Sequence, residues 1–547
     1  MIYDVIVVGG GAAGLMAALA AKDGMNRVAV ITKSNILKSN SAVASGGINA
    51  VLDENNKESI EKHIDDTLKS AKGLADRKTV NYMCREAPRI IKKLTDYGVK
   101  FDSDENGNIL QRNFGGSSEN RTCFVGDNTG SAITQTLIKR AKLSGIELLQ
   151  NVFVMDIVKT KNRISGIIAL KRVDSSVIVY LAKAVIFAAG GYAGIYRGFS
   201  TNAQDTNGDI LAVALRSGLM LEDLEFVQFH PTGFAKSGAL ISEAARAEGA
   251  LLVNGSGESF INELDTRDVI SRAIFNEIQK GEKVYIDMRH IDKERLLSRV
   301  PSLYKNAFNL AGVDISSELL EIRPVAHYSM GGIKSDFTTT DIKGLFVCGE
   351  CAALGIHGAN RLGGNSLLEA VVFGELAGKK AKEFSQNRSF LPIDYDKVIK
   401  NINLVQRIFE WDATKNFNAI RISAGKTMYL KAGIIRDKEK LEEALDYIKY
   451  LRLESASLHC MDKSRENNVE LVAILELRNI LQLSEAVILS ALFREESRGA
   501  HFRSDFADMD AQKERHVLVK QLEGRFFKLQ YEDGRLIRFL SRFFQGV

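Results

Sequence analysis

Residues 323–374 concentrate the polar side chains best suited to chemistry, among them His327 and Arg361. Arg361 lies in a glycine-punctuated loop just before Ser366, which we expect to open an apolar helix over residues 367–377. A helix N-terminus has free N–H groups, and with fixed glycines and an arginine it suits a bound anion or an electron-rich ring. The alternative, an ordinary glycine-rich connection, would leave His327 and Arg361 without an apparent partner nearby in sequence.

An apolar run at residues 344–349 is typical of a buried strand, and Glu350 follows it directly. The strand would therefore deliver an acid to its carboxyl end. Cys348 and Cys351 form a CxxC pair, but no second pair or histidine cluster completes a zinc site. We predict buried thiols here and no metal site.

The N-terminal segment carries the GxGxxG pattern of a dinucleotide-binding turn at residues 9–14. A strand is expected before it, at residues 3–8, and an alanine-rich helix after it. The glycines let the backbone approach a pyrophosphate that lies on the helix dipole. A second strand, at residues 27–32, should end in an acid that binds the ribose of a simple NAD site, but Thr32 and Lys33 stand there instead.

Three later segments are expected to approach the same nucleotide. Residues 39–47 form a small-residue loop that would lie flat along a large planar cofactor. Residues 183–191 indicate a buried strand that ends in a second glycine turn. Asp209 begins a helix that runs to about Gly218, where it would either cap the helix or hold the cofactor's phosphates through a water molecule.

Length and composition indicate a soluble globular protein of about three or four domains, with 547 residues, 45% apolar and 26% charged. The net charge of +5 is spread along the chain and favours neither nucleic acid nor a membrane surface. Five scattered cysteines are too few for a disulfide framework, so a reducing, cytoplasmic location is favoured. The apolar stretch at residues 5–21 is broken by glycines and follows no basic region, so we expect no signal peptide or membrane span.

A series of short motifs, spread in order over about residues 1–505, resembles the fumarate reductase/succinate dehydrogenase flavoprotein superfamily, which includes L-aspartate oxidase. The motifs are Thr32-Lys33, Ser45-Gly46-Gly47, Phe114-Gly115-Gly116, Asn207-Gly208-Asp209, and those that begin at His230, Ser242, Thr266, His327, His357 and Glu496. The resemblance implies FAD as the cofactor. It also explains Thr32-Lys33, which this family uses where simpler dinucleotide folds have an acid.

The expected fold class is α/β. A Rossmann-like FAD-binding domain would comprise residues 1–224 and 326–385, with an inserted α+β capping domain at residues 225–325 that closes over the flavin and excludes water. A helical domain is expected at residues 394–505. The tail, residues 506–547, alternates around a turn at 532–535 and suggests a β-hairpin.

The resemblance implies a set of cofactor-binding residues from the two glycine turns, the small-residue loop and the strand and helix ends. They are Gly9, Gly11, Ala12, Ala13, Gly14, Thr32, Lys33, Ser39, Asn40, Ser41, Ser45, Gly46, Gly47, Ala189, Gly190, Asp209, Glu350, Arg361, Ser366 and Leu367. Asn40 takes the place of the histidine that carries flavin covalently in membrane-bound members. Because asparagine cannot form that bond, we expect non-covalent FAD with a lower potential, which favours reduction of fumarate.

Fumarate is a planar dianion, and its reduction needs a hydride at one carbon and a proton at the next. Suitable donors for its carboxylates are His230, Ser242, His327 and Arg361. Pinning both ends would place the double bond against flavin N5. Phe114 stands where aspartate oxidases carry a glutamate that meets the substrate's ammonium group, and an aromatic side chain suits a dicarboxylate without one. Glu119 is close enough in sequence to act as a substitute.

By the same resemblance the proton donor is Arg267, supplied by Glu243 and Arg246 in a relay. Arginine normally keeps its proton, so this works only in a dry site where its neighbours reprotonate it at once. Glu243 and Arg246 are three residues apart and face the same way if the segment is helical. The alternative is a salt-bridged pair that supports the cap.

The leading interpretation is the catalytic flavoprotein subunit of a fumarate reductase or succinate dehydrogenase, with L-aspartate oxidase as the alternative. A non-catalytic flavin-binding subunit would be expected to lack His327, Arg361 or Arg267, and none is missing. The sequence has no iron–sulfur cysteine set, haem motif or membrane anchor. We therefore expect an iron–sulfur subunit as the electron partner, and contact with the inner face of the cytoplasmic membrane only through partners.

Overall fold

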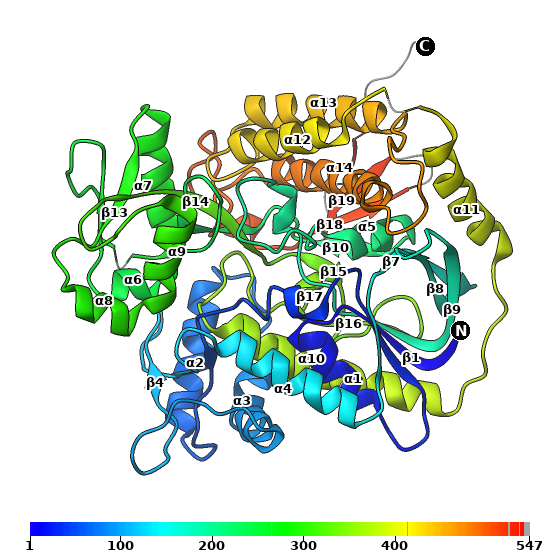
Figure 1. Ribbon diagram of the computed structural model, residues 1–547, viewed down its shortest axis with the longest axis horizontal. Coiled ribbons are helices and arrows are strands. Elements are labelled where there is room, and N and C mark those ends of the chain that lie inside the picture. The colour runs from blue at the N-terminus through cyan, green and yellow to red at the C-terminus, as the bar shows by residue number, and fades with distance from the viewer. Residues whose placement is uncertain (264, 413, 523–525, 535–536, 541–547) are drawn as a thin grey trace.

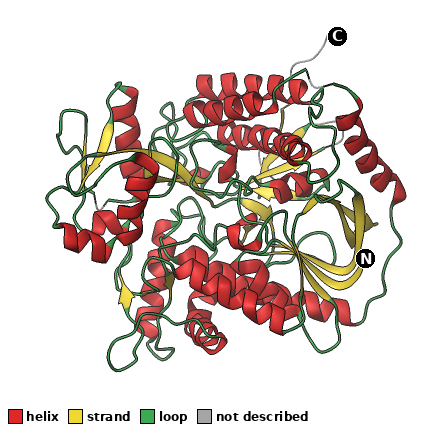
Figure 2. Cartoon of the chain, viewed as in Figure 1, coloured by secondary structure: helices red, strands yellow, loops and turns green. Residues whose placement is uncertain are grey.

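The computed structural model describes residues 1–263, 265–412, 414–522, 526–534 and 537–540 (Figure 1). Three groups of elements are visible in this view: a sheet flanked by helices, a lobe on the left, and a set of helices along the top (Figure 2). We refer to them as the central part, the cap and the helical part. Within the described residues, no helix has both the length and the apolar character that crossing a membrane requires.

The central part is built on a sheet of order β6-β2-β1-β9-β8-β7, in which β16 also pairs with β9. Its strands are β1 (Ile2–Val8), β2 (Val28–Ile31), β6 (Glu147–Leu149), β7 (Val152–Thr160), β8 (Arg163–Lys171), β9 (Val177–Phe187) and β16 (Leu345–Val347). Parallel pairing joins β6, β2, β1, β9 and β16. Strand β8 pairs antiparallel with β9 on one side and with β7 on the other. The carboxyl ends of the parallel strands therefore share one edge, where the two glycine turns, Lys33 and Glu350 follow.

In one group of helices of the central part, two lie directly on this sheet and pack closely on each other, and the others pack against these two or against one another. These helices are α1 (Ala12–Ala21), α2 (Lys57–Ser70), α3 (Arg77–Tyr97), α4 (Thr129–Leu143) and α10 (Asn365–Gln386). α10 crosses α1 at Gly374 and Gly378, where an added Cβ would lie 2.5 Å from Ala13 O and 2.2 Å from Ala17 O. These two glycines are needed because no side chain fits between the helices.

The sequence-based start of α10, with Ser366 as the cap and the helix from residue 367, is two residues too late, and its end at residue 377 is too early. The helix begins at Asn365 after Gly364, which has a φ of +81°, and continues to Gln386. The apolar run ends where the helix leaves the core, but a helix continues through exposed polar residues as readily as through buried ones. Residues 57–98, which have a helical pattern, form two helices, and the Asp76 side chain caps the second.

The cap is an antiparallel sheet of order β11-β14-β13-β12 with helices against it. Its elements are β11 (Val227–Phe234), α6 (Ala244–Ala247), β12 (Leu251–Val253), α7 (Arg267–Gln279), β13 (Val284–Asp287), α8 (Lys293–Arg299), α9 (Pro301–Ala311) and β14 (Leu320–Ser329). It has a hydrophobic core of its own, separate from that of the central sheet. β11 and β14 pair along their length and lead from the cap into the central part, so they bring His230 and His327 to the junction (Figure 1).

The helical part comprises α11 (Tyr395–Glu410), α12 (Phe417–Lys431), α13 (Lys438–Ser455) and α14 (Val469–Phe493). α14 is buried over most of its length and packs against α5 (Asp209–Arg216) of the central part. Most of its buried side chains are apolar, but Glu476, Asn479, Gln482 and Glu485 are buried polar residues on the same helix.

Two smaller sheets complete the fold. One has the order β17-β15-β10-β18-β19-β20, with β10 (Met220–Glu222), β15 (Gly332–Lys334), β17 (Ala352–Ala353), β18 (Val517–Gln521), β19 (Phe527–Tyr531) and β20 (Ile537–Leu540). The other joins β3 (Ile48–Asn49), β4 (Gln111–Arg112) and β5 (Thr122–Cys123). β19 and β20 are antiparallel neighbours. Arg535 of the expected hairpin turn, and residues 541–547 of the tail, lie outside the described residues.

Candidate active site

A long cavity of about 540 Å³ runs along the carboxyl edge of the central sheet. The expected cofactor residues that line it are Gly9, Gly11, Ala13, Thr32, Lys33, Ser39, Asn40, Ser41, Ala189, Gly190, Asp209, Glu350, Ser366 and Leu367. His327 and Tyr328 of β14 also line it. This cavity therefore extends from the first glycine turn to His327, on the strand β14 that leads out of the cap.

Six of the expected cofactor residues, Ala12, Gly14, Ser45, Gly46, Gly47 and Arg361, are not among the residues that line this cavity. Gly14 closes the first turn, since an added Cβ would lie 2.0 Å from Gly9 O. Gly47 has a φ of +129°, and an added Cβ would meet Cys123 O at 2.7 Å. These glycines allow two stretches of backbone to pack closely against each other. A glycine pattern in a sequence looks the same whether the glycine contacts backbone or a ligand.

The loop before α5 was not among the predicted site residues, yet it lines the cavity through Thr201, Asn202, Ala203, Asp205 and Thr206. No glycine pattern marks these residues, and Asp205 is the charged side chain among them; only the motif that starts at Asn207 points to the region. The loop is held by Asn40, whose Oδ1 accepts a hydrogen bond from Ala203 N at 2.8 Å. Asn40 therefore has a hydrogen-bond partner within the protein.

Lys33 is held between two carboxylates on the wall of the long cavity. Its Nζ lies 2.5 Å from Asp209 Oδ2 and 2.6 Å from Glu476 Oε1 of α14. Burial disfavours the ammonium ion, but the two carboxylates outweigh this effect and raise the pKa of Lys33. Capping of α5 by Asp209, one of the two alternatives, is wrong: Gly208 is the N-cap, and the Asp209 side chain binds Lys33 and Asn479.

Two helix N-termini border the cavity and have no side-chain cap. Gly11 precedes α1, and Gly364 precedes α10. Free N–H groups at such termini bind anions, and the close turn at Gly9 lets a phosphate approach the first of them. The donor set, the length of the cavity and the glycine turns fit FAD.

Arg267 and Arg361, which are far apart in the sequence, meet beside the long cavity. Arg267, the first residue of α7, donates from NH1 to Gln228 Oε1 at 3.1 Å. Arg361 donates from NH2 to the same oxygen at 3.1 Å and from NH1 to Ser366 Oγ at 2.8 Å. Burial, followed by the charge of Arg267, lowers the pKa of Arg361 to about 10. The two guanidinium groups thus face one small region of the protein.

Glu243 links this region to a third arginine. Its Oε2 accepts from Arg267 NH2 at 2.7 Å, and its Oε1 lies 3.7 Å from Arg246 NH2. Burial opposes ionisation of Glu243, but Arg267 and Arg246 hold its pKa below the usual value. Arg246 is itself buried and donates from NH1 to Glu263 O at 2.7 Å. The structure therefore brings together all three residues of the expected relay.

His230 and His327 face each other with ring centroids 5.4 Å apart. Burial, and then the nearby arginines, lower the pKa of both imidazoles well below the usual value, so both are neutral at pH 7. Nδ1 of His327 lies 2.8 Å from Thr201 Oγ1, and Nδ1 of His230 lies 3.1 Å from Thr232 O. Nε2 is therefore the ring nitrogen left to each histidine for a ligand.

Phe114 borders the same region: an added Cβ on Gly363 would lie 3.5 Å both from Arg267 NH2 and from the Phe114 ring. Ser242 lies at the start of α6, where its Oγ accepts from Ala244 N at 3.3 Å. Glu119 makes its ion pair with Lys62 of α2, at 2.8 Å, rather than with the arginines. The aromatic side chain, and not the acid, is thus the group beside Arg267.

Glu350 lies at the end of β16, as the apolar run predicted, and lines the long cavity. Ser329 donates to its Oε1 from N at 3.0 Å and from Oγ at 3.1 Å. Burial raises the pKa of Glu350 to about 7. This carboxyl group is therefore able to hold or release a proton at neutral pH on the wall of the long cavity.

Comparison with known proteins places this geometry in a family. The FAD binding domain family matches residues 4–367, and the fumarate reductase flavoprotein C-terminal family matches residues 421–539. The succinate dehydrogenase flavoprotein subunit of Rickettsia conorii is 36% identical over 98% of this chain and 95% of its own. An uncharacterized FAD-dependent oxidoreductase of Methanocaldococcus jannaschii is 37% identical over 96% of this chain and 98% of its own.

Among solved structures, the FrdA chain of Escherichia coli quinol fumarate reductase superposes with a TM-score of 0.93 at 32% identity, covering 98% of this chain and 97% of that one. The fold and the cavity define an FAD-dependent oxidoreductase of the class that acts on CH–CH bonds. The chain belongs to the succinate dehydrogenase/fumarate reductase flavoprotein family. The matches support this assignment over L-aspartate oxidase.

Proposed function

We propose that the chain is the catalytic flavoprotein subunit that interconverts fumarate and succinate, with Arg267 as the proton donor. The observation that carries this proposal is the convergence of Arg267 and Arg361 on Gln228 Oε1 beside two neutral histidines. Two fixed cations and two uncharged donors match a molecule with one carboxylate at each end. Phe114 lies where an acidic side chain would be needed to bind the ammonium group of an amino-acid substrate such as L-aspartate.

In this proposal, Arg361 binds one carboxylate with two donors, and Nε2 of His327 or His230 donates to the other. When bound, FAD accepts a hydride from succinate or supplies one to fumarate. The chain's own contribution is to hold the C4 diacid flat against the cofactor at both ends, because a fixed orientation removes much of the entropic barrier. Closure of β11, β14 and α7 over the region excludes water, which strengthens each of these contacts.

The proton step uses the Glu243 contacts. In fumarate reduction, Arg267 gives a guanidinium proton to the carbon next to the one that receives the hydride. Glu243, 2.7 Å from Arg267 NH2, is itself ionised, so it takes up a proton from Arg246 on the other side of this carboxylate and passes that proton to the guanidine. Succinate oxidation runs the same path in reverse. Without these neighbours an arginine is too weak an acid for the role.

FAD is held without a covalent bond in this proposal. Asn40 lines the long cavity, has no nucleophilic ring nitrogen, and is already bonded to Ala203 N. Flavin should therefore appear in the supernatant after acid precipitation of the protein. Flavin that remains with the pellet would contradict non-covalent binding.

The electrons leave or arrive through a partner. Relatives such as that of Rickettsia conorii are named flavoprotein subunits, which supports an assembly of several chains. We propose an iron–sulfur subunit as the electron partner and, through it, a place at the inner face of the cytoplasmic membrane. Purification of the tagged chain from its own cells, followed by iron analysis of the chains that co-purify, tests the iron–sulfur partner. A chain that purifies from these cells alone and still supports turnover would contradict such a partner.

The identity of the substrate is tested by measuring turnover of the FAD-loaded chain on three compounds side by side. Fumarate is given anaerobically with a reduced dye, and succinate and L-aspartate are each given with an oxidised dye and with oxygen. We expect turnover of fumarate and succinate, with fumarate reduction the faster, and none of L-aspartate. Peroxide formed from L-aspartate, with succinate untouched, would overturn the proposal in favour of an aspartate oxidase.

A further inference from the structure

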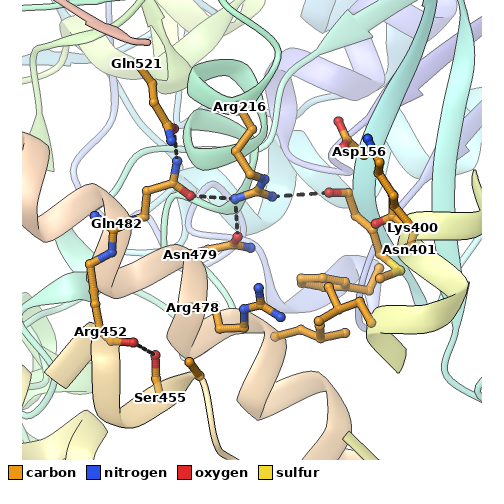
Figure 3. A pocket seen from close by; sticks show the side chains of 15 residues that line it. Asp156, Arg216, Lys400, Asn401, Arg452, Ser455, Arg478, Asn479, Gln482 and Gln521 are labelled. Carbon is orange, nitrogen blue, oxygen red and sulfur yellow. Dashed lines mark hydrogen bonds between the residues drawn. The ribbon is translucent and has the colours of Figure 1, made fainter. Parts of the chain in front are cut away.

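A second cavity, of about 330 Å³, lies between the central sheet and the helical part (Figure 3). Arg246, Arg267 and Arg361, which we call the arginine cluster, do not line it. Its walls come from β7, α5, α11, α13, α14 and β18. Four cations line it, Arg216, Lys400, Arg452 and Arg478, against one acid, Asp156. We call it the basic cavity.

The acids nearby are already paired. Asp156 binds Lys397 at 2.8 Å, and Glu485 binds Arg452. Arg216 instead donates from NH1 to Asn479 Oδ1 at 2.8 Å and to Gln482 Oε1 at 2.7 Å, and from NH2 to Met155 O at 3.2 Å. Among the described residues, no carboxylate forms an ion pair with Arg216. The charge of Arg216 is therefore not neutralised by an ion pair from the walls of the cavity.

Arg216 is solvent-accessible, yet burial lowers its pKa. Both observations follow because the side chain lies on the wall of the basic cavity, as Figure 3 shows. Arg216 is the last residue of α5, so it also interacts favourably with the helix dipole. That interaction accounts for Arg216 at this place, but not for Lys400 on the same walls.

We propose that the basic cavity binds a small multivalent anion that bears phosphate or carboxylate groups. Its volume is in the range of small-molecule sites. Arginine forks and a lysine recognise such groups, and the neutral amides of Asn479, Gln482 and Asn401 add hydrogen bonds that fix orientation. This site is independent of the proposed reaction, since none of the residues of the arginine cluster lines it.

The basic cavity adjoins the nucleotide end of the long cavity. Phe153 lines both. Asn479, which accepts from Arg216, donates from Nδ2 to Asp209 Oδ1 at 2.8 Å, and α5 runs from Asp209 to Arg216. A phosphate probe would also enter the pyrophosphate site of protein without flavin. Binding must therefore be measured on FAD-loaded protein.

The test is calorimetric titration of the FAD-loaded full chain with pyrophosphate and, separately, with citrate, at constant ionic strength set by sodium chloride. We expect saturable binding of one ion per chain. Arg216→Gln and Lys400→Gln should each weaken it by about tenfold. Lys400 is exposed on α11, so its variant tests the site even if Arg216→Gln folds poorly.

Two control variants distinguish binding in the basic cavity from binding elsewhere on the protein. Lys426→Gln removes an exposed lysine of α12 that does not line the cavity, and it should leave the affinity unchanged. Arg361→Gln should abolish turnover of succinate but keep binding of the probe. Saturation by pyrophosphate alone identifies a phosphate ligand, and saturation by citrate alone a polycarboxylate. No saturation by either, equal weakening in Lys426→Gln, or loss in Arg361→Gln overturns the proposal.

Discussion

Arg267 and Arg361 share one hydrogen-bond acceptor, since each guanidinium group donates to Gln228 Oε1 at 3.1 Å. The amide nitrogen of Gln228 donates to Asn360 Oδ1 at 2.8 Å and to Arg361 O at 2.9 Å, which fixes the side chain with its oxygen toward the arginines. Two like charges would otherwise repel each other in a buried site. Gln228 therefore positions the two cations for a dianion.

Gln228→Leu keeps the size of this side chain but removes both its acceptor and its donors. We expect kcat/KM for succinate to fall by about a hundredfold, mainly through KM, because the arginines no longer converge. Steady-state kinetics on FAD-loaded protein measures this. Gln135→Leu, on the exposed face of α4, is the matched control and should change nothing. An unchanged KM with full flavin content would show that Gln228 does not position the arginines.

Arg267→Ala tests the proton donor. Arg267 does not line the long cavity, so the variant should retain FAD. Loss of the acid should lower kcat by about a thousandfold in both directions of the reaction. Arg272→Ala, one turn further along α7 and paired with Asp268, should keep its activity. Retained turnover in Arg267→Ala would remove this residue as the acid.

His63 predicts an acid-sensitive stability. This imidazole is buried on α2 against Asn365, and burial lowers its pKa to about 4 from an ordinary 6.5. The unfolded chain therefore binds a proton between these values that the folded chain does not, so stability falls as pH decreases below 6.5. The contribution is about 2 kcal/mol between pH 7 and pH 5.

Thermal unfolding of the parent and of His63→Gln, at pH 7 and pH 5, measures that contribution. Glutamine keeps a donor for Asn365 but does not titrate. The variant should lose less stability on acidification than the parent does. His290→Gln removes an exposed histidine of the cap and is the control. Equal losses in the parent and in His63→Gln would contradict the assignment.

The nucleotide end of the site could be predicted because its requirements are local. A strand, a turn of glycines and a helix follow one another in sequence, so the backbone approach at Gly9 is encoded where it is used. The strand that ends at Glu350 is equally local. Where the ligand is bound by consecutive residues, sequence and structure agree.

The rest depends on contacts between distant segments. The partners of Asp209 come from Lys33 and from α14, so a pattern that suggested a helix cap indicated the wrong role. Gln228 precedes His230 in β11 and is an ordinary strand residue until the loop of Arg361 is placed beside it. The loop at residues 201–206 has no motif and lines the cavity only because β14 lies next to it.

The last prediction concerns Lys33, which lies on the wall of the long cavity and compensates the carboxylates of Asp209 and Glu476. Lys33→Met leaves Asp209 and Glu476 without this counter-charge, although Glu476 keeps Arg421 at 3.3 Å. Uncompensated buried charge costs about 3–5 kcal/mol. We therefore expect the dissociation constant of FAD to rise by a hundredfold or more, on the order of 3 kcal/mol, as measured by fluorescence titration of protein freed of flavin.

Adding Asp209→Asn to Lys33→Met removes the carboxylate that has lost its partner, while Arg421 still neutralises Glu476. The double variant should therefore recover part of the FAD affinity. Lys38→Met changes a lysine on the same cavity that bridges no carboxylate pair, and it should bind FAD as the parent does. If Lys33→Met binds FAD as tightly as the parent, or if the second substitution weakens binding further, charge compensation is not how Lys33 acts.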